Sequence, residues 1–264
     1  MTPTFFDYGS GKLAWYKTGS GKPLLILHGW GSSSAVMTPL AEKLGRLRTC
    51  YMIDFPGFGQ SPEPSEPWAV DDYAGAVKAF TKEFFKDNSY DLLVHSYGGR
   101  VALKLLTSDE AKSIDKVIFT GAAGLKPKRK LSFYFKKYTA KTLKFPFSLL
   151  PEASREKGLN RLRNTTLWKK LGSSDYQQLS GVMRETFVKS VTEYLDPLLA
   201  QIDHEVLLIW GRDDASTTLD QGERMDTGLK NSALIVIDGA GHYAFLDKPA
   251  HFTAIAESYL TSEK

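Results

Sequence analysis

The stretch Leu92–Val101 reads LLVHSYGGRV and passes from an apolar run, through a serine, to two glycines and a helical pattern. This order is typical of a nucleophile elbow, a sharp turn that holds a serine hydroxyl above the end of a strand. Ser96 would then be the nucleophile, and the amide N–H of Tyr97 would lie at a helix N-terminus, where it can stabilise an oxyanion. The simpler alternative is that Ser96 only caps the following helix.

On both sides of this stretch, short apolar runs alternate with patterns of helical period. Runs that are apolar on both faces are typical of parallel strands covered by helices. The expected strands are Pro23–Leu27, Thr49–Ile53, Tyr90–Val94, Asp115–Phe119, Glu205–Trp210 and Ala233–Ile237. The expected helices are Ala35–Leu47, Val70–Lys86, Tyr97–Ser108, Leu219–Leu229 and Pro249–Leu260. The alternation predicts an α/β fold with a mostly parallel, doubly wound sheet.

Local signals also mark one edge of the sheet and the starts of three helices. Two alternating segments, Thr4–Asp7 and Lys12–Lys17, flank a Gly-Ser-Gly turn and predict an antiparallel hairpin at the sheet edge. Residues that can cap helices precede or open three of the helical patterns, and we expect them to be the N-caps. They are Asp71, Ser216 or Thr217, and Asp247.

The alternation is interrupted once, between about Leu125 and Asp196, where the sequence is helical, basic and aromatic. From Leu125 to Gly172 there are 14 Lys and Arg against two Asp and Glu, whereas the rest of the chain has 20 basic and 28 acidic residues. We expect residues 1–124 and 197–264 to form the core, with residues 125–196 inserted as a helical, basic lid. The aromatic side chains between the cations would face a pocket; they are Phe133, Tyr134, Phe135, Tyr138, Phe145, Phe147 and Trp168.

The composition of the whole chain excludes several classes of protein. The 264 residues are 42% hydrophobic and 24% charged, which excludes a disordered or fibrous chain. A single cysteine, Cys50, excludes a disulfide framework within the chain and a cysteine zinc cage. The N-terminal sequence has neither the basic nor the apolar region of a secretory signal, and runs such as Leu24–Leu27 are too short to span a bilayer. We therefore expect a cytoplasmic protein.

Two further motifs follow predicted strands and complement the serine turn. His28–Gly31 reads HGWG, which can turn toward a pocket and offer the amide N–H of Trp30 as a second oxyanion donor. We expect His28 itself to be a structural, hydrogen-bonded residue. Farther along, Asp213 and Asp214 follow one strand and His242 follows the next. The chain order serine, acid, histidine is that of a nucleophile with its general base and an orienting carboxylate.

Taken together, these motifs resemble the lid-bearing serine hydrolases of the α/β-hydrolase fold. The resemblance is carried by HGWG (His28–Gly31), DFPGFGQS (Asp54–Ser61), HSYGGR (His95–Arg100), WGRDD (Trp210–Asp214) and GAGHYAFLDKP (Gly239–Pro249). Val94 departs from the family, which usually has a glycine there. The resemblance implies a catalytic triad of Ser96, Asp214 and His242, because the family acid usually comes three residues after the glycine that Gly211 matches. It also implies oxyanion donors at Trp30 and Tyr97.

The implied reaction is hydrolysis of carboxylic esters or thioesters of small to medium acyl groups through an acyl-enzyme, with no cofactor and no metal. Arg100 is a candidate for binding a substrate carboxylate and is otherwise a surface residue. The basic insertion would attract an anionic ester substrate, or would make a weak contact with an anionic membrane surface. No nucleic-acid-binding motif accompanies the positive charge. The sequence does not indicate an oligomeric state.

Two other functions are compatible with the same residues. SYGGR at Ser96–Arg100 also resembles the serine motif of the menaquinone-pathway lyases of this fold. The first alternative is therefore a lyase or carbon–carbon bond hydrolase that acts on a carboxylated substrate with the same triad. The second is a protein that binds a ligand without turnover. A shared fold does not separate these possibilities, since it supports many reactions.

Overall fold

An eight-stranded sheet, with strands in the order β1-β2-β4-β3-β5-β6-β7-β8, forms the centre of the computed structural model. β1 (Thr4–Tyr8) and β2 (Gly11–Thr18) form the predicted antiparallel hairpin at one edge. The remaining strands are parallel and match the predicted apolar runs to within two residues at either end. They are β3 (Pro23–Leu27), β4 (Thr49–Asp54), β5 (Tyr90–His95), β6 (Ile114–Thr120), β7 (Glu205–Gly211) and β8 (Asn231–Ile237).

The structure describes residues 1–264 except 10, 87, 129–130, 149, 164, 166–178, 180 and 263–264. The chain forms two units, which we call the core unit (Met1–Lys126 with Glu185–Lys264) and the inserted unit (Pro127–Arg184). The predicted insertion, residues 125–196, is wider than the inserted unit, because Glu185–Asp196 groups with the core. Trp168 lies outside the described residues, as do the side chains of Phe133, Tyr134 and Phe135.

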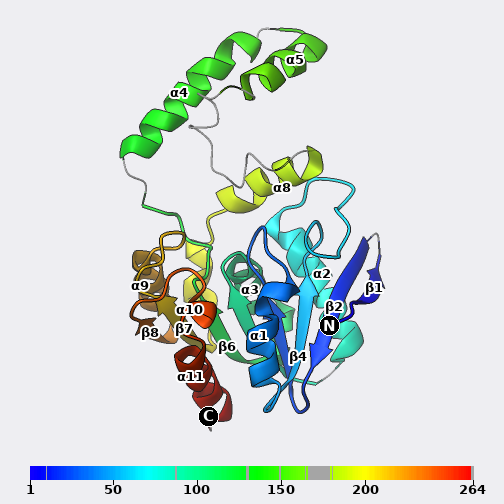
Figure 1. The fold of residues 1–264 in the computed structure, drawn as a ribbon, viewed down its shortest axis with the longest axis vertical. Coiled ribbons are helices and arrows are strands. Elements are labelled where there is room, and N and C mark those ends of the chain that lie inside the picture. The colour runs from blue at the N-terminus through cyan, green and yellow to red at the C-terminus, as the bar shows by residue number, and fades with distance from the viewer. Residues whose placement is uncertain are drawn as a thin grey trace. The chain divides into compact units, whose positions relative to one another are not determined.

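Helices cover both faces of the sheet (Figure 1). One face carries α1 (Ser34–Leu44), α10 (Ala244–Asp247) and α11 (Pro249–Thr261), which share an apolar cluster with alternate sheet residues such as Leu207 and Ile209. The other face carries α2 (Val70–Phe84), α3 (Gly98–Leu106) and α9 (Leu219–Gly228). Burial on both faces explains why central strands such as β3 and β5 carry continuous apolar runs.

The two ends of the predicted insertion, residues 125–196, are joined to each other by hydrogen bonds. The amide of Leu195 donates to the carbonyl of Gly124 at 2.9 Å, and the amide of Lys126 donates to the Asp196 carboxylate at 2.9 Å. Arg224 of α9 binds the same carboxylate at 2.8 Å. Between these ends, α4 (Leu131–Ser148) and α5 (Glu152–Arg163) belong to the inserted unit, and α8 (Gly181–Thr192) runs from the inserted unit into the core unit. Short 3-10 turns span Asp109–Ser113 and Asp196–Gln201.

The three predicted N-caps are wrong by one or two residues, because each side chain has another partner or position. The cap of α2 is Ala69, whose amide donates to the Asp72 carboxylate at 2.7 Å, and Asp71 lies inside the first turn. The cap of α9 is Thr218. The cap of α11 is Lys248, while the Asp247 carboxylate accepts the amide of Gly241 at 2.7 Å. A capping residue type therefore located each helix start only approximately.

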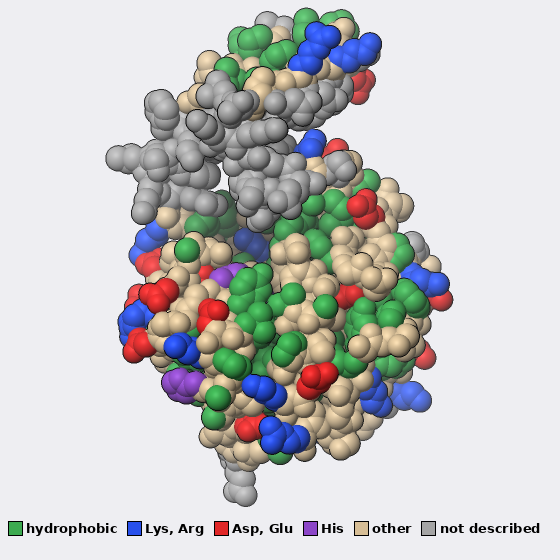
Figure 2. Space-filling model, viewed as in Figure 1, with side chains coloured by type: hydrophobic (Ala, Val, Ile, Leu, Met, Phe, Trp, Pro, Cys, Tyr) green, Lys and Arg blue, Asp and Glu red, His purple; other side chains and the backbone are tan. Residues whose placement is uncertain are grey.

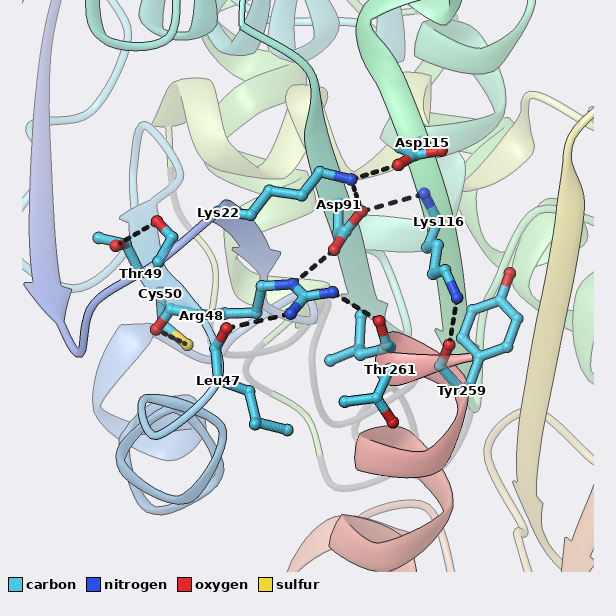
Figure 3. A network of polar contacts seen from close by, with 12 residues as sticks. Lys22, Leu47, Arg48, Thr49, Cys50, Asp91, Asp115, Lys116, Tyr259 and Thr261 are labelled. Atoms are coloured by element: carbon cyan, nitrogen blue, oxygen red, sulfur yellow. Dashed lines mark hydrogen bonds and ion pairs between the residues drawn. The ribbon is translucent and has the colours of Figure 1, made fainter. Parts of the chain in front are cut away.

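The edge of the sheet where the parallel strands begin is held by a buried ionic cluster (Figure 3). Asp91, at the start of β5, is fully buried and accepts hydrogen bonds from Lys22 Nζ and Arg48 Nε, both at 2.7 Å. The same Arg48 donates to the Leu260 carbonyl at 2.6 Å, and Lys116 donates to the Tyr259 carbonyl at 2.6 Å. These cations satisfy the carbonyls at the end of α11, where positive charge is favourable.

The surface of the core unit mixes both signs of charge. On the face drawn in Figure 2, its Lys and Arg side chains are interspersed with Asp and Glu, and apolar side chains lie between them. In the part of the chain that the structure describes, no helix is both long enough and apolar enough to cross a membrane.

Candidate active site

Ser96 lies at the carboxyl end of β5 in a conformation that few residues other than glycine adopt. Its φ is +50°, in the left-handed region, which costs a residue with a Cβ about 1–3 kcal/mol and persists only where the surroundings enforce it. Here the amide of Ser96 donates to the Thr120 carbonyl at 3.1 Å. Its own carbonyl accepts the amides of Gly99 at 2.9 Å and Ala123 at 2.8 Å. These bonds hold the sharp turn that the sequence predicted.

The two glycines after the turn are required by close packing. A Cβ on Gly98 would lie 2.7 Å from the Leu27 carbonyl oxygen, and one on Gly99 would lie 2.6 Å from the Cβ of Ala122. Val94, which departs from the family pattern, is buried within β5 and pairs with β3 and β6 on either side. The elbow therefore forms with a valine at this position.

Ser96, His242 and Asp214 come together although up to 146 residues separate them in the sequence. The Nε2 atom of His242 lies 3.0 Å from the Ser96 hydroxyl oxygen, and its Nδ1 atom lies 2.8 Å from an Asp214 carboxylate oxygen. They follow three parallel strands, β5, β7 and β8, so the sheet brings their carboxyl ends to one edge. Such an edge is where open α/β sheets bind ligands.

Asp214, and not Asp213, is the acid beside His242. Asp214 is only 4% exposed, whereas Asp213 is exposed and its amide donates to the Ala240 carbonyl at 2.9 Å. Burial opposes ionisation of the Asp214 carboxyl, but hydrogen bonds from His242 and Thr217 outweigh burial and hold its pKa below the usual range. A carboxylate kept ionised in this way can orient the imidazole and stabilise its charged form.

Two further residues beside Asp214 and His242 are not indicated as site residues by any sequence pattern. The Thr217 hydroxyl lies 2.8 Å from the same Asp214 oxygen and 2.8 Å from the Gly121 carbonyl, and the Thr217 amide donates to the other Asp214 oxygen at 2.9 Å. Gly121, with a φ of +49°, lies so close that a Cβ there would be 3.1 Å from Asp214 and 3.2 Å from His242. The sequence indicates Thr217 only as a candidate N-cap, and no pattern in the sequence marks Gly121.

His95 supports the loop that carries His242. Its imidazole is 1% exposed, and Nε2 donates to the His242 carbonyl oxygen at 3.0 Å, with the two rings 4.7 Å apart. Nδ1 is then unprotonated, and it has no hydrogen-bond partner among the described residues. His28 is also buried; Nδ1 donates to the Gly29 carbonyl at 2.7 Å and Nε2 accepts the Phe55 amide at 3.0 Å. This confirms the structural role expected for His28.

We predict that His95 makes the folded protein sensitive to acid. Burial and the neighbouring His242 ring lower the pKa of His95 to about 3, against about 6.5 in an unfolded chain. Between these values the unfolded chain binds the additional proton, so stability is lost as the pH falls, by at most about 1.4 kcal/mol per pH unit. Urea unfolding of wild type and His95→Gln at pH 7.5, 6 and 5 should show a shallower loss for the variant.

His251 provides the control for this prediction, because it is exposed and unlinked to the site. His251→Gln should reproduce the wild-type dependence of stability on pH. His28, whose pKa burial also lowers, contributes to the remaining slope in every variant. Equal slopes for wild type and His95→Gln would contradict the assignment.

The loop His28–Gly31 lies against the serine turn. A Cβ on Gly29 would be 3.0 Å from the Cβ of Ser96, so Trp30 directly follows a residue that packs against Ser96. Among the hydrogen bonds of the described residues, neither the amide of Trp30 nor that of Tyr97 donates to an acceptor in the protein. Both amides are therefore available to an oxyanion at Ser96.

Arg100 does not join this group. It is 6% exposed, on α3, and its guanidinium donates to the backbone carbonyls of Glu193 and of Val191, the latter at 3.3 Å. From the sequence, Arg100 was expected either to bind a substrate carboxylate or to lie on the surface. The structure instead uses it to satisfy carbonyls at the end of α8, where a cation is favourable.

The described residues contain no group of three His, Cys, Asp or Glu side chains that could hold a metal ion. The groups that the described residues bring together are the hydroxyl of Ser96, the imidazole of His242, the carboxylate of Asp214 and the amides of Trp30 and Tyr97. A histidine within hydrogen-bond reach of a hydroxyl and oriented by a carboxylate can remove the hydroxyl proton as the oxygen attacks.

Comparison with known proteins gives consistent results. The family model described as alpha/beta hydrolase fold matches residues 22–249. An AB hydrolase superfamily protein of Bacillus subtilis is 25% identical over 92% of this chain and 93% of its own length. A pimeloyl-[acyl-carrier protein] methyl ester esterase of Aliivibrio fischeri is 28% identical over 94% of this chain and 97% of its own length. The structure of an esterase from Exiguobacterium antarcticum superposes with a TM-score of 0.74 at 23% identity, over 99% of this chain and all of that one.

Proposed function

Because the chain belongs to the alpha/beta hydrolase fold family, we propose that it is a serine hydrolase that cleaves carboxylic esters or thioesters through an acyl-enzyme intermediate. The observation that carries the proposal is the contact of the Ser96 hydroxyl with His242 at 3.0 Å and of His242 with Asp214 at 2.8 Å. The esterase named among the relatives supports ester hydrolysis as the general reaction.

In the first half of the reaction, the Ser96 oxygen attacks the ester carbonyl while His242 Nε2 takes the hydroxyl proton. Asp214 accepts the Nδ1 proton of His242 in a hydrogen bond, which selects the tautomer with a free Nε2 and stabilises the imidazolium. The tetrahedral intermediate collapses, the bond to the leaving alcohol or thiol breaks, and His242 returns the proton to that leaving group. Water then attacks the acyl-serine while His242 takes a proton from it, the bond between the acyl group and the Ser96 oxygen breaks, and His242 returns the proton to that oxygen as the acid leaves.

Negative charge on the carbonyl oxygen would be held by the amides of Trp30 and Tyr97. Loss of one such donor typically costs about 3–4 kcal/mol of transition-state stabilisation. The Tyr97 amide has an additional advantage, because Tyr97 directly precedes α3 and the N-terminal end of a helix carries partial positive charge.

For the substrate we propose an ester of a small or medium acyl group that carries negative charge. The supporting observation is the charge of the inserted segment, with 14 Lys and Arg against two Asp and Glu between Leu125 and Gly172. Such a segment would raise the local concentration of an anionic ester or make a weak contact with an anionic membrane surface. The chain would act without a cofactor.

A panel of p-nitrophenyl esters from acetate to decanoate tests the proposal, together with an ester that ends in a carboxylate and its neutral analogue. We expect many turnovers per protein molecule, with rates that fall once the acyl chain becomes too long to be accommodated beside Ser96. We also expect the KM of the carboxylated ester to rise between about 10 mM and about 0.5 M salt, since salt screens long-range attraction. The KM of the neutral analogue should not change.

Two outcomes would contradict the proposal. Equal salt responses of the two esters would reject the anionic substrate while leaving ester hydrolysis standing. Absence of turnover on every ester by a correctly folded protein would reject ester hydrolysis. The carbon–carbon bond hydrolase or lyase would then become the leading function, followed by ligand binding without turnover.

A further inference from the structure

The second half of α8, from Glu185 to Thr192, belongs to the core unit and packs one face against the rest of it. Thr186 and Ser190 are completely buried, and Phe187 is half-buried, whereas Val188 and Lys189 are exposed. Buried positions four residues apart lie on one side of a helix. A serine and a threonine on this side need hydrogen-bond partners, because unpaired hydroxyls are costly to bury.

The partner of Ser190 is the side chain of Tyr97, the residue that follows the nucleophile. The Tyr97 hydroxyl donates to the Ser190 hydroxyl at 3.0 Å, and Tyr97 is only 2% exposed. Its backbone amide is one of the two donors assigned to the oxyanion. A hydrogen bond at the far end of the ring therefore restrains the residue whose amide must point at the reacting carbonyl.

The other donor residue touches the same helix. The Trp30 ring packs edge-on against Phe187 of α8, with centroids 5.2 Å apart, and against the Tyr97 ring, with centroids 5.1 Å apart. Phe58 packs on Trp30 as well, at 4.8 Å. Aromatic pairs in this geometry attract beyond their buried area. Trp30 and Tyr97 thus form a continuous packed group with Phe187 and Ser190.

Hydrogen bonds on both sides of the Phe187 and Ser190 contacts hold residues 185–192 of α8 in place within the core unit. The Thr186 hydroxyl accepts the Trp68 amide at 3.0 Å, and Lys189 Nζ donates to the Pro67 carbonyl at 2.8 Å. At its end, Arg100 binds the carbonyls of Val191 and Glu193. These bonds give α8 a fixed position from which it can hold other side chains, which also assigns a purpose to the buried Arg100.

We propose that Ser190 and Phe187 of α8 are positioning residues that hold Tyr97 and Trp30 so that their amides point at the oxyanion. The inference rests on the proposed function and extends it to residues outside the triad and the two oxyanion donors. Small displacements of a donor matter, because a misplacement of about 1 Å can cost about 100-fold in rate.

The variants Tyr97→Phe, Ser190→Ala and their combination test the hydroxyl contact, and Phe187→Leu tests the aromatic contact. Tyr97→Phe keeps the ring and the backbone amide. The readout is the ratio of rates on an ester and on the matching thionoester, in which sulfur replaces the carbonyl oxygen. Sulfur is a poor acceptor of hydrogen bonds, so the thionoester gains little from the oxyanion donors. A structural defect elsewhere would lower both rates equally.

Each single variant should lower kcat on the ester about 5–20-fold with little change in KM, and should lower the ester-to-thionoester ratio by a similar factor. The double variant should resemble Ser190→Ala alone, because both changes remove the Tyr97–Ser190 bond and only Ser190→Ala also removes the longer bond, 3.5 Å, to the Trp68 carbonyl. Val188→Ala is the matched control on the exposed side of α8, with Val188 45% exposed, and should behave as wild type.

An unchanged ratio in an active Tyr97→Phe and Phe187→Leu would overturn the positioning role while the proposed function stood. A raised KM at an unchanged ratio would also overturn it, since that result assigns these residues to substrate binding. If the wild type itself turned over no ester, the proposed function would fail and the inference would fail with it. Should Ser190→Ala not fold, Tyr97→Phe tests the same bond.

Discussion

Ser96→Ala is expected to lower kcat on every ester substrate by on the order of 10⁴-fold or more, with KM changed little. The hydroxyl is the only candidate nucleophile at the end of β5, and without it His242 has no proton to accept from the protein. The residual rate would come from substrate binding and the oxyanion donors alone. A further His242→Ala change should add almost nothing, because residues that act as a unit are not additive. Retention of about a hundredth of the wild-type rate would contradict the mechanism.

Two neighbouring carboxylates supply a matched control for this prediction. Asp214→Asn should lower kcat by on the order of 10²–10⁴-fold, because an amide beside Nδ1 favours the wrong tautomer and removes the charge that stabilises the imidazolium. Asp213→Asn should change kcat less than about twofold, since Asp213 is exposed and the Nδ1 atom of His242 bonds to Asp214 instead. The measurement is kcat on an ester substrate for wild type and both variants, with purified, folded protein at pH 7.5. Equal losses for both variants would show that Asp214 lacks the assigned role.

Asp91→Ala is expected to lower the free energy of unfolding by about 3–5 kcal/mol. The substitution leaves Arg48 without its buried counter-charge and leaves Lys22 paired with Asp115 alone. It also removes the acceptor of the Lys116 amide, which lies 3.2 Å from the Asp91 carboxylate. Urea unfolding at pH 7 measures the loss. The kinetic constants of the variant that remains folded should stay near those of wild type, because this cluster lies where the strands begin and Ser96 lies where β5 ends.

Asp238→Asn is the comparison for this second prediction. Asp238 also pairs with an arginine, Arg212, but both side chains are more than half exposed. An exposed pair is worth no more than about 1 kcal/mol, because water and salt screen it. A loss of less than about 1 kcal/mol in Asp91→Ala would mean that the buried cluster adapts to the missing charge, against expectation.

The sequence predicted much of the fold because the determining signals are local. Apolar runs such as those of β3 and β5 are continuous because both faces of a parallel strand are covered, and that property is visible without coordinates. The turn at Ser96–Gly99 could be recognised for the same reason, since its left-handed residue and close packing leave a mark on a few adjacent residues. N-caps were predicted less well, because the chosen side chains were closer to other backbone amides or other polar groups.

By itself, the sequence determined the fold class, the hairpin at the sheet edge, the candidate nucleophile and the order of the candidate acid and base. The family resemblance implied Asp214 as the acid, and the tertiary structure brings Asp214 to 2.8 Å from His242 and leaves Asp213 exposed. The tertiary structure alone decided that Arg100 serves the end of α8. It also decided that Thr217, Gly121, His95 and Ser190 support the site. The physical reason is distance along the chain: the Tyr97–Ser190 bond spans 93 residues and the His95–His242 bond spans 147. Such contacts depend on how strand ends and helix faces come together, which the periodicity of a local segment does not specify.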